Sequence, residues 1–142
     1  MKKIFSYILY GFYQIDYCFG FRFNEFYNIR TGYTLFTLSI LAYISSIVNI
    51  LSVLGGHFIA QYINSIESWL RIDIAISLGI VFFIDFYYLG KDFYIEDFQE
   101  LDKEPNFMRW LLFFISIAFG IVGMVWCIKS GFWARSKMDC FF

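Results

Sequence analysis

Two carboxylates within an apolar segment are the residues of this sequence that could carry chemistry. Asp73 and Asp85 are the only charged residues between Arg71 and Lys91. A carboxylate in the hydrocarbon of a membrane costs about 3 kcal/mol or more, so it normally faces protein or water, or is held protonated. The two positions therefore predict either buried hydrogen bonds or a polar path for ions.

The segment around these carboxylates predicts a helix with one polar face. At 100° per residue its polar side chains fall within an arc of about 120°. The structural interpretation of Asp85 is a buried hydrogen bond that its carboxylate accepts from Asn49, from a serine within residues 33–56 or from a tyrosine hydroxyl. The functional interpretations are a ring of carboxylates that lines a cation pathway in an oligomer, or a group that senses or relays protons. The intramembrane polar residues predicted in this way are Asp85, Asp73, Ser77, Tyr88 and Asn49.

Enzymatic chemistry finds little support in the sequence. Cys18, Cys127 and Cys140 have no close spacing and His57 is the single histidine, so local sequence supplies no zinc or redox motif. Sequence motifs for nucleophilic, metalloprotease or phosphate-binding sites are also absent. We therefore expect no enzyme activity, no cofactor and no metal. The net charge of −1 creates no field that attracts nucleic acid, so no nucleic-acid partner is expected.

Three long apolar segments must position the carboxylates. They cover residues 33–56, 67–90 and 107–128, and a helix of about 20 residues crosses the hydrocarbon core of a bilayer. The chain has 142 residues, of which 60% are hydrophobic, so these segments and their connections use most of it. We predict an all-α integral membrane protein, a single membrane domain over residues 1–142 with three transmembrane helices.

The N-terminal segment, residues 2–19, separates apolar from polar side chains at helical spacing. Such a helix lies in the membrane interface with its apolar face toward the acyl chains. Its polar side carries a stripe of tyrosines that we expect to anchor it among the headgroups. Two alternatives remain: the segment forms a fourth span, or the stripe stacks an aromatic ligand. The tyrosines are Tyr7, Tyr10, Tyr13 and Tyr17.

An acidic segment, residues 91–104, follows the second apolar segment. No proline occurs before Pro105, so residues 65–104 could form one helix, bent near Gly90, that leaves the membrane as a cytosolic extension. Its carboxylates form a possible docking surface for a partner. The third span follows, with Trp110 and Trp126 near its ends as interface anchors, and residues 129–142 form a tail.

Small and hydroxylated residues gather on one face of the first and the third span. Such faces let helices approach closely and hydrogen-bond to one another. Because three spans enclose no useful pore, conduction would require a homo-oligomer built on these faces. The helix-packing residues are Ser46, Ser52, Ser116, Gly120 and Gly123.

The distribution of Lys and Arg indicates the orientation. With the N-terminus inside, seven of the eleven lie on the inner side and four on the outer side. We therefore place the chain in the cytoplasmic (inner) membrane of a bacterium, with the N-terminus inside. Its expected partners are the lipid bilayer, further copies of itself and a protein on the cytosolic side.

The expected function is that of a small oligomeric membrane protein that forms or gates an ion-permeable pore. In size and layout the chain is similar to many short bacterial membrane proteins, a group that includes membrane-permeabilising effectors and membrane-bound accessory or immunity subunits. The alternative is a non-conducting accessory, immunity or scaffold subunit. Such a subunit would bind its partner through residues 92–104 or through the N-terminal tyrosines.

Overall fold

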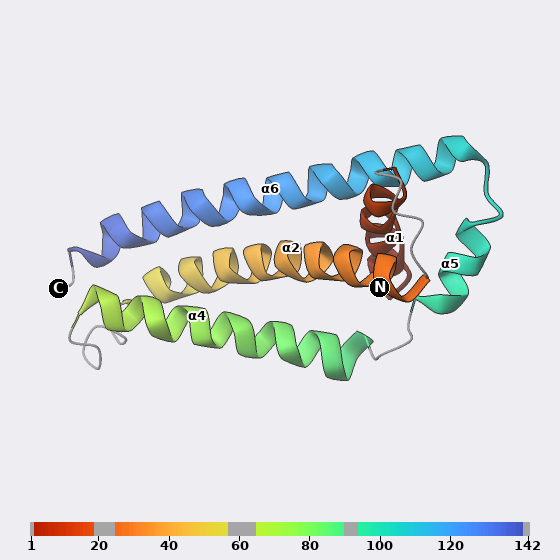
Figure 1. Cartoon of the computed structure of the whole chain (residues 1–142). Helices are drawn as coiled ribbons and strands as arrows, with labels where there is room; N and C mark the ends of the chain where they lie inside the picture. The colour runs from red at the N-terminus through yellow and green to blue at the C-terminus, as the bar shows by residue number, and fades with distance from the viewer. Residues whose placement is uncertain (1, 19–24, 57–64, 90–93, 141–142) are drawn as a thin grey trace.

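The computed structural model describes residues 2–18, 25–56, 65–89 and 94–140, and every element in these ranges is helical (Figure 1). The predicted all-α class is therefore confirmed for the described part of the chain. The elements are α1 (Lys2–Cys18), α2 (Glu25–Leu54), α4 (Ile66–Phe83), the π-helix η1 (Ile84–Leu89), α5 (Ile95–Leu101) and α6 (Asn106–Met138).

Three long helices run side by side, with α2 between α4 and α6 (Figure 1). The short helix α1 runs across α2 and α6 near one end of the bundle and contacts both. Helix α5 lies at the same end, against α1. The carboxyl end of α6 and the beginning of α4 form the opposite end of the molecule.

Two of the described helices are long and apolar enough to cross a membrane. They are Gly32–Leu54, within α2, and α6, with 23 and 33 residues. At 1.5 Å per residue these helices measure about 35 Å and about 50 Å, more than the hydrocarbon core requires. The third predicted span corresponds to α4 and η1. Helix α4 has 18 residues and carries three charged side chains, Glu67, Arg71 and Asp73, in its first half, so charged residues are more closely spaced in it than in the other two.

The helix predicted over residues 65–104 is interrupted. Helix α4 passes into η1 at Ile84, and α5 is a separate helix that packs against α1. Residues 90–93, where a bend was expected, lie outside the described residues. The physical reason for the separate helix is its apolar face, because Phe98 and Leu101 are buried in the core at this end of the bundle.

Helix α1 approaches α6 more closely than an interfacial helix resting on lipid requires. A Cβ atom added to Gly11 would overlap the backbone oxygen of Leu112 and the side chain of Ser116. The Ser116 hydroxyl donates a hydrogen bond to the backbone oxygen of Ile8, at 2.8 Å. Gly11 therefore permits the contact between the two backbones, and we call this region the α1–α6 crossing.

The larger hydrophobic core surrounds this crossing. It joins side chains from α1, α2, α4, α5 and α6, and it includes Leu9, Phe12, Phe36, Ile40 and Leu112. A smaller cluster at the opposite end joins Trp69 of α4 to Ala134 and Met138 of α6. The two clusters hold α4 and α6 onto α2 from opposite ends.

Candidate functional site

Helix α4 turns one narrow face toward the rest of the bundle. Its buried residues recur every four positions: Trp69, Asp73, Ser77 and Val81. Helix α4 packs mainly on α2, and we call this contact the α2–α4 seam. The outer face of α4 is apolar and exposed, with Ile72, Ile74, Ile76, Leu78, Ile80 and Phe82. Of the polar residues predicted on this helix, Asp73 and Ser77 thus lie inside the protein.

Asp73 is the most deeply buried carboxyl group of the described residues. Its side chain is 4% exposed, and its Oδ1 atom has no hydrogen-bond partner within the described ranges. One helical turn away, the indole N–H of Trp69 is also buried and unpartnered there. Because a buried polar group without a partner costs about 1–3 kcal/mol, this part of the seam lowers the stability of the fold.

Asp85 lies in the seam beyond Val81, as the second residue of the π-helix η1. Its Oδ2 atom accepts a hydrogen bond from the Thr37 hydroxyl of α2, at 3.3 Å, whereas its Oδ1 atom has no partner in the described residues. Short π-helical turns occur frequently at functional sites. This end of the seam therefore has two special features. It contains a π-helical turn, and only one oxygen of its carboxyl group is hydrogen-bonded to α2.

Thr37 was not among the partners predicted for Asp85, which were Asn49, a serine and a tyrosine. Helices α2 and α4 run in opposite directions (Figure 1), so residue 37 meets residue 85. Equal rise along both helices then places Asn49 at about the level of Asp73. Asn49 is nevertheless turned to α6, where its Nδ2 atom donates to the Ser130 hydroxyl at 3.5 Å. The register of the antiparallel pair was the signal that could have identified Thr37.

The remaining polar residues predicted for this site have local roles. The hydroxyl of Ser77 donates to the backbone oxygen of Asp73 at 2.9 Å, and that of Ser46 donates to the oxygen of Ala42 at 2.8 Å. Ser52 is buried in α2. The side chain of Tyr88 lies outside the described residues. Of the predicted polar set, the structure therefore brings Asp73, Ser77 and Asp85 together on one face.

The small-residue face of α6 is used within the chain. Ser116 contacts α1, as described above. A Cβ atom on Gly120 would lie 3.2 Å from the Ser39 hydroxyl, and one on Gly123 would lie 2.7 Å from the ring of Tyr43. The Tyr43 hydroxyl donates to the backbone oxygen of Phe119 at 2.9 Å. The surfaces expected to join separate chains thus join α6 to α1 and α2, which leaves the expected homo-oligomer without its predicted contacts.

The N-terminal tyrosines do not form a free stripe. Tyr10 is 0% exposed, and its hydroxyl donates to the Asp102 carboxylate at 2.8 Å. Burial and this carboxylate raise the pKa of Tyr10 above its ordinary value. Tyr7 and Tyr13 are half-buried, and the side chain of Tyr17 lies outside the described residues. The prediction that Tyr10 anchors the chain among headgroups is therefore wrong, because α5 covers this side of α1.

The segment that carries α5 presents acidic side chains outward. Glu96, Glu100, Asp102 and Glu104 are exposed, while the apolar side of α5 is buried against α1. Arg109 of α6 donates to the backbone oxygen of Asp102 and ties the following turn to α6. The described part of the predicted acidic extension thus forms an acidic surface at one end of the bundle.

Both predicted tryptophan anchors are exposed. Trp110 lies near the beginning of α6 and Trp126 two thirds of the way along it, so their role at the two boundaries of a membrane remains a prediction. Within the described ranges, His, Cys, Asp and Glu side chains form no group that could hold a metal ion.

No protein-family model matches this chain, and neither a curated protein nor a solved structure matches it.

Proposed function

We propose that the chain is an integral membrane protein that lets cations cross the membrane. We propose further that the cations pass along the α2–α4 seam. Two apolar helices of sufficient length, α2 and α6, support the membrane location. So does the distribution of side chains, because exposed apolar residues cover the outer faces of α4 and α6 whereas serines and Asp73 are buried inside. In this proposal α4 and η1 form the third span.

The observation that carries the proposed path is the pair of carboxyl groups in the seam. Asp73 and Asp85 each have a buried oxygen atom without a partner in the described residues. They are twelve residues apart on one helix, which corresponds to about 18 Å along its axis. Carboxylates that a membrane protein retains despite the free-energy cost of burying them normally mark an ion or proton pathway. Their negative charge favours cations.

Helix α4 is the element that would open this path. It packs mainly on α2, and the isoleucines of its outer face are exposed in the described part of the chain. At the end of α4, beside Asp85, the π-turn lacks the regular hydrogen-bond pattern of an α-helix. A small movement of α4 away from α2 would admit water to Asp73 and Ser77. This proposed path lies between two helices of one chain and replaces the path between subunits that was expected from the sequence.

The test is cation flux in liposomes that contain the purified protein. Asp73→Asn and Asp85→Asn keep the size of the side chain and remove its charge. We expect each variant to reduce the flux at least about ten-fold, a change of about 1.4 kcal/mol in the barrier. Glu100→Gln, which removes an exposed carboxylate of α5, is the matched control and should leave the flux unchanged.

Two results would contradict the proposed path. One is wild-type flux no greater than that of empty liposomes. The other is flux that persists unchanged in both asparagine variants.

A second function, that of a non-conducting accessory subunit, is supported by the acidic surface of α5. The buried Phe98 and Leu101 hold α5 against the bundle, and its exposed carboxylates are complementary in charge to a basic partner. Glu96→Lys with Glu100→Lys should abolish recovery of such a partner after cross-linking in the native membrane. Asp73→Asn should leave that recovery intact, and partner recovery that survives the charge reversal would contradict this function.

A further inference from the structure

A long apolar groove lies between α2 and α6, outside the seam described above. Its volume is about 630 Å³, and its walls include Ile50 of α2 and Ile121, Val125, Trp126, Lys129 and Trp133 of α6. The lining residues of α6 recur about every four positions, so they occupy one face of the helix. From Ile121 to Trp133 this face extends about 18 Å.

Lys129 is the charged side chain of the groove. Ser130, also in its lining, is already engaged: its hydroxyl donates to the backbone oxygen of Cys127 at 3.0 Å and accepts from Asn49. Lys129 is exposed and forms no ion pair with the described residues. The groove thus combines an apolar wall, two indole rings and one unpaired cation near the basic end of α6.

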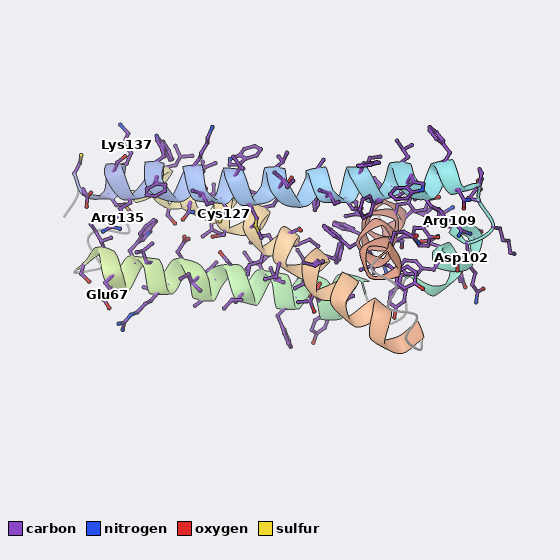
Figure 2. The ribbon with its side chains drawn as sticks, turned by 45° about the horizontal axis from the view of Figure 1, so that its top comes forward. Glu67, Asp102, Arg109, Cys127, Arg135 and Lys137 are labelled. Atoms are coloured by element: carbon purple, nitrogen blue, oxygen red, sulfur yellow. The ribbon has the colours of Figure 1, made fainter. Side chains whose placement is uncertain are left out.

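The surroundings of Lys129 are basic. Figure 2 shows Arg135 and Lys137 on α6 beyond Cys127, at the end of the bundle opposite Asp102 and Arg109. Glu67, which lies at this same end in Figure 2, is paired with Arg71. Asp73 is buried. A second copy of the chain in parallel orientation would therefore bring to this end only Asp139 as an exposed carboxylate without an ion pair among its described residues.

We propose that this groove binds an anionic phospholipid, with an acyl chain along the apolar wall and the phosphate paired with Lys129. The proposal rests on the membrane location proposed above. In a bilayer the groove faces acyl chains, and the flexible stem of Lys129 lets its ammonium group reach the headgroup level. Trp126 and Trp133 suit the same boundary, because indole rings favour the water–lipid interface. Charge complementarity selects the anionic lipid over a neutral one.

The test uses Trp126 and Trp133 as reporters of the lipid beside them. The double variant Trp69→Phe, Trp110→Phe retains fluorescence from these two rings alone. We would reconstitute it in phosphatidylcholine vesicles that contain a minor fraction of either brominated phosphatidylglycerol or brominated phosphatidylcholine. From one lysine at a membrane surface we expect about five-fold stronger association of the anionic quencher.

Two matched lysine variants distinguish a specific lipid site from a general attraction of anionic lipids to the basic surface. Lys129→Gln should bring the two quenchers to nearly equal efficiency. Lys137→Gln, which removes a cation of the same helix outside the groove, should retain most of the preference. Native mass spectrometry gives an independent readout with all tryptophans present: the wild type should retain phosphatidylglycerol over phosphatidylcholine, and Lys129→Gln should lose that selectivity.

The outcomes distinguish failure of the lipid site from failure of the membrane location. Equal quenching by both lipids in the tryptophan double variant that retains Lys129 would overturn the lipid site and leave the membrane location intact. An anionic preference that Lys137→Gln removes as fully as Lys129→Gln would also overturn it. Absence of quenching by either lipid would contradict the membrane location itself, whatever the result of the flux experiment.

Discussion

The α1–α6 crossing and the α2–α4 seam both bury polar groups, but they differ in how their polar side chains are paired. At the crossing the Ser116 hydroxyl reaches a backbone oxygen of α1, and the nearby Tyr10 hydroxyl reaches Asp102. In the seam Asp73 and Asp85 each keep a buried oxygen without a partner in the described residues. The crossing therefore has the properties of a structural joint, whereas the seam stores unfavourable free energy, as functional sites often do.

The largest effect that we expect belongs to the structural joint. Gly11→Ala introduces a methyl group against the backbone of Leu112 and the side chain of Ser116, so α1 and α6 must separate. We expect a loss of about 3 kcal/mol in the free energy of unfolding, measured by denaturation in detergent. Gly79→Ala is the control, because a Cβ atom there meets no atom within 4 Å. Equal stability of the two variants would contradict the close contact.

Substitution in the seam should instead raise the free energy of unfolding. Asp73→Leu replaces a buried, unpartnered carboxyl group with an apolar side chain of similar length. We expect it to raise the free energy of unfolding by about 1–3 kcal/mol while abolishing cation flux. Ser116→Ala, at the crossing, should lower the free energy of unfolding by about 1 kcal/mol. A destabilised Asp73→Leu variant would show that the carboxyl group supports the fold.

The comparison also shows what the sequence could and could not predict. Periodicity placed Asp73, Ser77 and Asp85 within one arc of a helix. In the structure Asp73 and Ser77 are buried, and Asp85 accepts a hydrogen bond from Thr37 of α2. Burial of Tyr10 could not be predicted, because its partner Asp102 is 92 positions away. The small residues of α6 indicated close packing correctly, but composition does not reveal whether the packed helix belongs to the same chain. Thr37 required the register of α2 against α4.

A smaller effect is expected at high pH, through Tyr10. Burial and Asp102 raise the pKa of its phenol in the folded state above its value in the unfolded chain. At a pH above about 10 the unfolded state loses this proton first and binds fewer protons, so stability falls as the pH rises. Tyr10→Phe should make the unfolding midpoint less sensitive to pH between about pH 9 and about pH 11. An identical pH dependence in both proteins would contradict this contribution.

The most direct test of the seam as a cation path is the access of water to its side chains. In a background in which Cys18, Cys127 and Cys140 are replaced by serine, Ser77→Cys and Ile76→Cys place single thiols on the buried and on the exposed side of α4. The measurement is the reaction rate of each thiol with a membrane-impermeant cationic thiosulfonate in liposomes. We predict that Ser77→Cys reacts and loses cation flux, whereas Ile76→Cys does neither. Reaction at Ile76→Cys with none at Ser77→Cys would contradict a path through the seam.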